Sequence, residues 1–548
     1  MTILLNGAGL VDGIQNAPSQ TRPLAGFGQL LRFMARRDRL RAPVWIASIV
    51  GLIAVSVASV VGLYDTPADL REYATLAQAD AALKAFAGPG YGLDDPTLGA
   101  VVMNETLVYT FIIVALMCMF LLTRHTRAEE ETDRAELVRA AVVGRQATLA
   151  AAVVWVAIVN VLVAFGLALS LLAFGLSLTG TVAYSAASCA VGMVFIGVAA
   201  VSAQVASSAR AANAATGVAL GMSFLLRAVG DLGTGWVTWL SPLGWAQLIR
   251  AFADERWWVL APLVLGALAL TYGAVVLSAG RDLGAGFFEQ RPGPVEASPR
   301  LASPLALAAR LQRTSLIGWT IGLSILGFFY GIVADQAEQM LENEAIADFF
   351  AQVGVGTPTE LFLATTVLMT GLLTSGYTVS TVLRLRTEEV AVRAEPVLAT
   401  PVSRRTWLLS YLTVSAVGTV VVMVAAGLAT GLGTAAQLGD LGQILPLLEA
   451  VLVMVPALLV LAAVTVALIG WRPRWGPLAW AAVAVSAVSG LLAETLDLPQ
   501  WARNVSPFEH VPAMPAASFE LLPTVLLTTV AVGLTLVGIV AINRRDIG

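Results

Sequence analysis

Long apolar runs separated by polar segments recur along almost the whole chain. A run of about 20 apolar residues is long enough to cross a lipid bilayer as an α-helix. The pattern predicts twelve spans, a fifth one ending near residue 231 and the others at roughly 43–64, 106–123, 148–174, 181–205, 257–278, 316–333, 361–382, 407–430, 450–469, 477–492 and 521–542. The sequence is therefore expected to fold as an all-α polytopic membrane protein.

A helix of a different kind is predicted ahead of the first span. Phe27, Leu30 and Met34 recur at helical spacing, and several arginines lie beside them. This pattern is typical of a helix that lies in the membrane interface. The expected division of the chain is a cytoplasmic leader with this elbow helix (1–42), a first six-span half (43–281), a cytoplasmic linker with a shorter second elbow helix (282–315) and a second six-span half (316–548).

Residues 124–146, the first charged segment, return half a chain later as residues 386–404, the second charged segment. Aligned without a gap, the two copies share many residues, among them Arg127/Arg386, Glu129/Glu388, Glu130/Glu389 and Arg134/Arg393. Ser241-Pro242 and Ser506-Pro507 repeat in the same register, as do Arg281-Asp282 and Arg545-Asp546. The pattern indicates a tandem duplication of a six-span unit, and an even number of spans makes the two halves parallel.

Each charged segment is predicted to begin as a helix. Glu130 and Arg134 form an acid-before-base pair at i,i+4 spacing, which supports a helix in the first segment. The second segment keeps this pair as Glu389 and Arg393, but Pro396 should end its helix early. Such a segment is either a solvated loop or a docking element for a cytosolic partner.

The composition of the chain argues against a soluble protein and against most kinds of catalytic site. With 57% hydrophobic and 12% charged residues, the chain cannot be a water-soluble globule. Lys84 is the only lysine, so the Gly-Lys-Ser/Thr phosphate loop of a nucleotide hydrolase is absent. Cys118 and Cys189 fall within expected spans, where packing is favoured over a disulfide or a metal site. His125 and His510 are expected on opposite sides of the membrane, so neither a catalytic nor a metal site is predicted.

The distribution of charge predicts the orientation of the spans. Of the 32 lysines and arginines, most fall in segments that are cytoplasmic if the N-terminus lies inside. The segments 65–105 and 335–350 are rich in acids and poor in bases, and they are expected to be external. This bias follows the positive-inside rule and predicts that both termini are cytoplasmic.

These features together resemble the permease subunits of type-2 ABC exporters, whose fold is called type V. The shared features are an elbow helix, a large first external loop, a Glu-Glu helix between spans two and three, a semi-polar region before span six and a terminal Arg-Asp. The wording RAEEETDRAELVRAAVVGR, FLLRAVGD, WLSPLGW and SPFEHVP is similar to fused twelve-span actinobacterial permeases described as tetronasin-type or polyketide-antibiotic exporters. The resemblance covers nearly the whole chain, and it implies that the membrane is a bacterial plasma membrane.

The resemblance implies a function and a set of partners. The chain would export hydrophobic compounds, and two copies of a separate nucleotide-binding subunit would bind ATP and Mg; the chain itself would bind no cofactor, and no nucleic acid is expected. The charged segments would be coupling helices that sit in a groove of that subunit. The residues expected at this contact are Arg127, Glu129, Glu130, Glu131, Arg134, Glu388, Glu389 and Arg393.

Arg227 and Asp231, at i,i+4 spacing near the end of the fifth span, have two interpretations. They form either a local ion pair or an element of an external gate, since charges at membrane depth usually face the protein interior or a watery path. Met222, Phe224 and Leu225 could contact an apolar cargo or simply pack. The pairs Gly217/Gly221 and Gly318/Gly322 match the small-xxx-small pattern of close helix contacts.

Two other functions stay open at this point. A proton-coupled drug antiporter would need carboxylates within the spans, and the pattern places none near a span centre. A sensor or immunity module that uses the permease fold would have the same sequence features as a transporting permease.

Overall fold

The computed structural model describes residues 23–64, 66–79, 84, 86–131, 143–233, 235–280, 296, 298–301, 303–334, 356–493 and 498–545. All regular elements within these residues are helices. Eleven of the described helices are long and apolar enough to cross a membrane. The chain is therefore an all-α polytopic membrane protein, as the hydrophobic pattern predicts.

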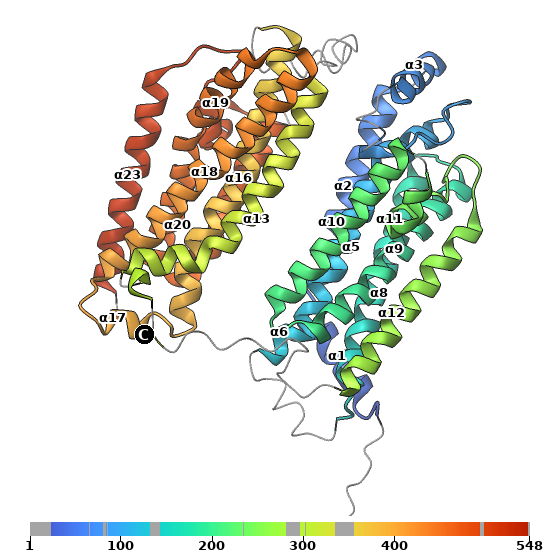
Figure 1. The fold of residues 1–548 in the computed structure, drawn as a ribbon, viewed down its shortest axis with the longest axis horizontal. Helices are drawn as coiled ribbons and strands as arrows, with labels where there is room; N and C mark the ends of the chain where they lie inside the picture. The colour runs from blue at the N-terminus through green and yellow to red at the C-terminus, as the bar shows by residue number, and fades with distance from the viewer. Residues whose placement is uncertain are drawn as a thin grey trace, which may run out of the picture. The chain divides into compact units, whose positions relative to one another are not determined.

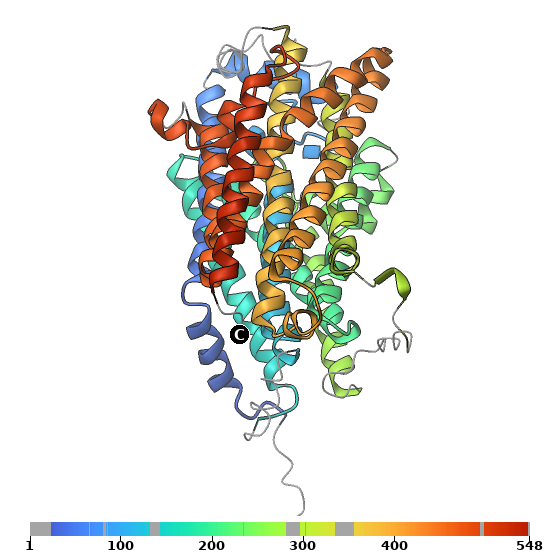
Figure 2. The same ribbon diagram turned by 90° about the vertical axis from the view of Figure 1, so that its left-hand side faces the viewer.

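The chain divides into two compact units, Met1–Gly293 (unit 1) and Pro294–Gly548 (unit 2), within each of which the long helices run side by side (Figure 1, Figure 2). The division falls inside the segment 282–315 that the sequence suggests as a linker. Each unit is described by itself below.

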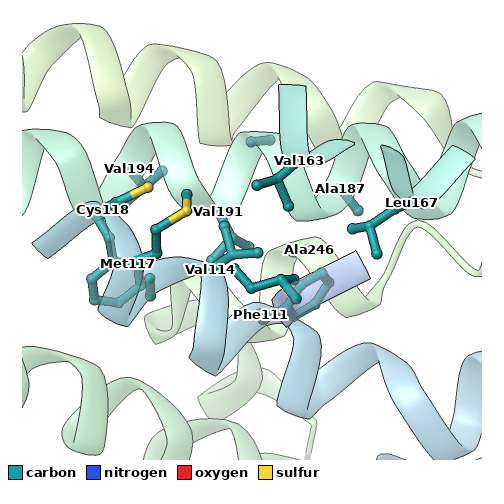
Figure 3. Packing of buried hydrophobic residues seen from close by; sticks show 14 of the residues in the cluster. Phe111, Val114, Met117, Cys118, Val163, Leu167, Ala187, Val191, Val194 and Ala246 are labelled. Atoms are coloured by element: carbon teal, nitrogen blue, oxygen red, sulfur yellow. The ribbon is translucent and has the colours of Figure 1, made fainter. Parts of the chain in front are cut away.

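Unit 1 is built around α9, which packs against α5, α8 and α12. Its elements are α1 (Phe27–Arg37), α2 (Arg41–Leu63), α3 (Pro67–Ala79), α5 (Leu98–His125), α6 (Arg127–Glu130), α8 (Ala147–Ala173), α9 (Leu178–Val205), α10 (Ala209–Leu232), η1 (Trp236–Leu240), α11 (Pro242–Gln247), η2 (Trp257–Val259) and α12 (Leu260–Gly280). In the core, Phe111 and Val114 of α5 meet Val191 of α9 and Val163 of α8 (Figure 3). Close packing of this kind holds membrane helices together, because lipid tails are as apolar as the side chains.

Unit 2 contains two helix pairs, α13 with α18 and α20 with α23, and α16 packs on both α18 and α20. Its elements are η3 (Pro299–Leu301), α13 (Pro304–Val333), α16 (Pro358–Val390), α17 (Glu395–Leu398), α18 (Arg404–Leu438), η5 (Leu441–Gln443), α19 (Ile444–Val453), α20 (Val455–Trp471), η6 (Pro473–Leu478), α21 (Ala479–Leu492), α22 (Gln500–Arg503), η7 (Pro507–His510) and α23 (Leu521–Arg544).

The two units share features that the sequence repeat predicts. In each unit the second and fourth membrane helices are the most enclosed: α5 and α9 in unit 1, and α16 and the α19–α20 pair in unit 2. Ser241 caps α11 by accepting a hydrogen bond from the Gly244 N–H, and Ser506 caps η7 by accepting one from the Phe508 N–H. The repeated Ser-Pro therefore starts a helical turn in both units, since a serine cap followed by proline favours the first turn of a helix.

Three elements differ from the hydrophobic pattern. The first external loop is predicted to extend to residue 105, but α5 already begins at Leu98, where Thr97 caps it. Asn104 lies inside this helix, and its side chain donates a hydrogen bond of 3.2 Å to the Tyr91 carbonyl oxygen. The expected second elbow is continuous with the seventh span in α13. The expected eleventh span corresponds to α21, which has only 14 residues, so a count of twelve spans stays a prediction.

The close helix contacts lie at other glycines than those predicted. A Cβ added at Gly217, Gly221, Gly318 or Gly322 would meet no atom within 4 Å in its own unit. One tight contact in unit 2 joins α13 and α18, where a Cβ on Gly331 would lie 2.1 Å from the Thr430 carbonyl oxygen. A Cβ on Gly433 would lie 2.3 Å from the Phe328 carbonyl oxygen. Backbone meets backbone here, so neither neighbour can rotate away.

Gly433→Ala is accordingly expected to destabilise the α13–α18 pair by about 1–3 kcal/mol, the usual cost of overpacking. Gly318→Ala is the matched control, because its site is open and alanine favours a helix over glycine. The thermal unfolding midpoint of the purified chain should fall for Gly433→Ala alone. Equal midpoints for the two variants would show that the close approach is not required.

Candidate functional site

The first charged segment continues directly from α5 into α6 and is tied to two other helices of unit 1. Glu129 forms an ion pair with Arg37 at the end of α1. The buried Arg127 pairs with Glu130, with 2.7 Å between guanidinium nitrogen and carboxylate oxygen. Glu131 is exposed and accepts a hydrogen bond of 2.8 Å from the Ala209 N–H at the start of α10. Four of the predicted contact residues therefore hold this end of unit 1 together. Arg134 lies outside the described residues.

A buried carboxylate next to this segment was not predicted from the sequence. Asp38 is fully buried at the end of α1 and bonds to His125, the last residue of α5. It also accepts a hydrogen bond of 3.1 Å from the Trp155 indole N–H of α8, and it lies 3.2 Å from the Arg124 guanidinium. Its only sequence signal is an acid within the arginine-rich run RRDR. This cluster joins α1, α5 and α8.

The electrostatic balance at Asp38 predicts a pH dependence. Burial raises the pKa of Asp38, but the hydrogen bond and charge of His125, the Trp155 hydrogen bond and the charge of Arg124 together outweigh it and hold the pKa below its usual value. The carboxylate's contribution to stability is therefore complete above the unfolded pKa of about 4 and is lost as the pH falls through the lower folded value.

Asp38→Asn is expected to cost about 1.5–3 kcal/mol at pH 7, the range for hydrogen bonds to charged groups. The difference from the wild type should shrink as the pH falls below about 4. Thermal unfolding of the detergent-purified chain between pH 7 and about 2 measures this, with the exposed Asp254→Asn as control. A difference that does not change with pH would contradict the assignment.

The second charged segment has different internal partners. Glu388 is buried and accepts from Arg384 at 2.6 Å and from Arg393 at 2.7 Å, which closes the turn between α16 and α17. The hydrogen bond with Glu388 raises the pKa of Arg393 above its usual value. Glu389 forms a two-pronged ion pair with Arg545, just beyond the end of α23. Equivalent glutamates of the two repeats thus hold different helices.

The turn after α16 exposes a small strained surface. Val390 and Val392 are exposed, and Val392 has a φ of 60°, a left-handed conformation that is rare for a β-branched residue. Strain of this kind persists where surrounding structure enforces it, often at functional sites. The helix of this segment ends early, as predicted, but it ends at Val390 and not at Pro396. Pro396 instead lies in the first turn of α17, a helix of only four residues. We call residues 390–396 the exposed tip of unit 2.

Arg227 and Asp231 form a buried ion pair of 3.6 Å at the opposite end of unit 1. The pair is part of a larger network that includes Gln247 of α11. Gln247 accepts from the Arg227 guanidinium at 3.3 Å and donates to the Asp231 carboxylate at 2.9 Å. Arg227 also donates to the Phe86 carbonyl oxygen at 3.1 Å, so the pair ties the 86–97 loop to α10 and α11. The local ion pair exists and also holds the loop.

The backbone after α11 is shaped by this arrangement. Arg250 and Phe252 both have positive φ values, 53° and 61°. The Phe252 ring lies against the backbone of α5 and α9, where a Cβ on Gly99 or Gly180 would come within 2.6 Å or 2.1 Å of it. The Arg250 guanidinium lies 4.6 Å from the centre of the Tyr91 ring. This end of unit 1 is therefore closed by interlocked side chains.

The three apolar residues predicted near the gate do not gather in one place. Met222 and Leu225 are exposed on the face of α10 that turns away from its own unit. Phe224 packs against Phe86, with ring centres 6.2 Å apart, and its ring lies 4.8 Å from the Arg227 guanidinium carbon. Phe224 thus belongs to the Arg227 network, whereas Met222 and Leu225 do not.

Within the described residues, no group of three or more His, Cys, Asp or Glu side chains could hold a metal ion. His510 bonds to the Asn504 carbonyl oxygen, and Cys118 and Cys189 are free thiols. The site features are therefore ion-pair networks at the two ends of the helices.

Comparison with known proteins identifies the family of the chain. Residues 301–542 match the family described as "Multidrug efflux system permease Rv1217c, C-terminal domain". The chain is also 39% identical to the multidrug efflux system permease protein Rv1217c of Mycobacterium tuberculosis over 544 residues, which cover 97% of each chain. Agreement at this level over nearly the full length of both proteins shows that the chain belongs to the family of multidrug efflux system permeases that includes Rv1217c.

Proposed function

We propose that the chain is the membrane-spanning subunit of an ATP-driven ABC exporter with twelve spans and both termini in the cytoplasm. Two copies of a separate nucleotide-binding subunit bind ATP and Mg and dock on the two charged segments. The cargo is a hydrophobic drug-like compound, with polyketide antibiotics as the class that the sequence resemblance favours. The relationship to a multidrug efflux permease supports the transport role.

The observation that carries the proposal is the construction of the second charged segment. It continues without a break from α16, one of the two most enclosed helices of unit 2, so a force on the segment reaches the core of the unit. Glu388 and Glu389 are bonded inside the chain, which leaves the exposed tip for a partner. The glutamates thus brace the docking element, and Val390, Val392 and Arg393 present its contact surface.

The same logic applies to the first charged segment at the end of α5. Among the described residues of this segment, Glu131 and Arg145 are exposed, while Arg127, Glu129 and Glu130 are more enclosed and form ion pairs. Because the two segments have different internal partners, the two ATPase copies make unequal contacts even if they are identical. Such charged surfaces select the partner and its register more than they add affinity.

A proton-driven antiporter is the second candidate, and one observation favours it. Glu105 lies within α5, a membrane-spanning helix, rather than in the loop before it. Carboxylates within spans often mark proton pathways. Loss of transport in Glu105→Gln without loss of any bound ATPase would support this candidate.

The deciding experiment is co-purification of the full chain with the ATPase encoded beside it, followed by ATP hydrolysis. Val390→Asp places a charge on the exposed tip, and Val505→Asp is a matched control, since both valines are 65% exposed and Val505 is expected on the external side. We expect two ATPase copies per chain, retained by Val505→Asp and reduced by Val390→Asp. If no ATPase associates with the wild-type chain, the proposed function fails. If both variants bind equally, the assigned tip is wrong.

A further inference from the structure

A groove of about 590 Å³ lies on unit 2 where α20 and α23 end. It is lined by Trp471, Leu536, Val537, Val540, Ala541, Arg544 and Arg545. From Leu536 to Arg544 the α23 wall is about 12 Å long, at the helical rise of about 1.5 Å per residue. The groove is thus apolar along its length and cationic at one end.

The apolar wall belongs to a helix face that its own unit leaves uncovered. Leu536, Val537 and Val540 are each about half exposed, and most of α23 is not buried inside the unit. In a membrane protein such a face is covered by lipid chains or by another membrane segment. An apolar surface of about 12 Å along this helix suits an acyl chain.

The cationic end has unsatisfied capacity for an anion. The Arg545 guanidinium is paired with Glu389, but Arg544 is exposed and has no carboxylate partner among the residues that the structure describes. Arg472 follows Trp471 directly and lies over the Trp475 ring at 5.2 Å. Arginine binds phosphate oxygens through two parallel N–H groups, and tryptophan is enriched at the level of lipid headgroups.

We propose that this groove binds an anionic phospholipid, with the phosphate at Arg544 and one acyl chain along Leu536, Val537 and Val540. A free inorganic anion would use only the cationic end, and a neutral lipid only the wall, so the complete groove fits a molecule with both parts. Under the proposed topology the groove faces the inner leaflet. Because Arg545 lines the groove and bonds to Glu389, the bound lipid lies next to the base of the exposed tip. The inference does not depend on ATP as the energy source.

Native mass spectrometry of the full, delipidated chain in detergent tests the proposal with phosphatidylglycerol and phosphatidylcholine as probes. Arg544→Gln removes the cation, and Arg405→Gln removes another exposed arginine of unit 2 that does not line the groove. One arginine near a charged lipid changes binding by about fivefold. We expect the preference for phosphatidylglycerol to fall by about this factor in Arg544→Gln and to persist in Arg405→Gln.

A second variant tests the wall. Val540→Trp fills the apolar part of the groove and leaves Arg544 in place, so it should also weaken phosphatidylglycerol binding. Inorganic phosphate should not change the phosphatidylglycerol binding of either variant. Wild-type binding that does not distinguish the two lipids, or a preference that survives Arg544→Gln, would overturn the proposal. Competition by inorganic phosphate at millimolar concentration would assign the cationic end to a free anion instead.

Discussion

Arg227→Ala is expected to lower the free energy of unfolding by about 3–5 kcal/mol, the cost of breaking a buried ion pair by removing one partner. The carboxylate of Asp231, which is 3% exposed, would keep only Gln247 and Thr238 as partners. The Phe86 carbonyl oxygen would also lose its donor. The 86–97 loop should therefore loosen, and the closed end of unit 1 should open more often.

The chain offers an unusually clean measurement of that loosening. Lys84 is its only lysine and lies two residues before Phe86, so a lysine-specific protease has a single cleavage site. Cleavage of the native protein should be faster in Arg227→Ala than in the wild type, together with a lower thermal midpoint. Arg256→Ala is the control, because Arg256 forms a more exposed ion pair with Asp254 that is worth at most about 1 kcal/mol. Unchanged cleavage and an unchanged thermal midpoint in Arg227→Ala would refute the conclusion that this network holds the 86–97 loop against α10 and α11.

Exchange of the charges of Glu389 and Arg545 should show whether Glu389 only stabilises unit 2 through this ion pair or also contacts the proposed partner. Glu389→Arg alone places two cations together in a position where the side chains are only 10–15% exposed. It should cost about 3–5 kcal/mol, as for other broken buried pairs. The double variant Glu389→Arg/Arg545→Glu restores opposite charges and should recover most of the thermal stability.

The second readout of this pair is stimulation of the ATPase that we propose as partner. If Glu389 acts only as a brace, the double variant recovers stimulation together with stability. Recovery of stability without stimulation would mean that Glu389 itself contacts the partner. Arg405→Glu reverses the charge of an exposed residue that forms no ion pair with any described residue, and it should change neither property. Failure of the double variant to regain stability would contradict the ion pair.

The hydrophobic pattern predicts most of the helices because a bilayer demands long apolar runs with internally bonded backbones. It fails where side chains override it. Thr97 caps α5 and Asn104 finds a carbonyl partner, so the helix begins within a stretch that looks polar. The run 477–492 is a different case: it forms a helix, α21, within two residues of the predicted bounds, but its 14 residues are fewer than the about 20 that a span needs.

The repeat predicts the charged segments but not their partners. Aligned glutamates suggest equivalent contacts, yet Glu129 bonds to Arg37, whereas Glu388 bonds to Arg384 and Arg393. The partners of Glu388 are close to it in the sequence, and the i,i+4 spacing of Arg384 could have indicated one of them. The Arg37–Glu129 bond depends instead on which helix ends meet in space, and sequence spacing carries no record of that. Asp38 was missed for the same reason, because an acid among arginines looks solvated until α5 and α8 are packed against it.

The different partners of Glu129 and Glu389 also set an order of events during synthesis. The Arg37–Glu129 bond joins residues 92 positions apart, so it can form while most of unit 2 is still to be made. The Arg545–Glu389 bond spans 156 positions and needs the residue that follows α23. The second charged segment therefore lacks this bond until α23 has been made. A chain cut short before α23 would leave Glu389 without this arginine, whereas the Arg37–Glu129 bond of unit 1 would be intact.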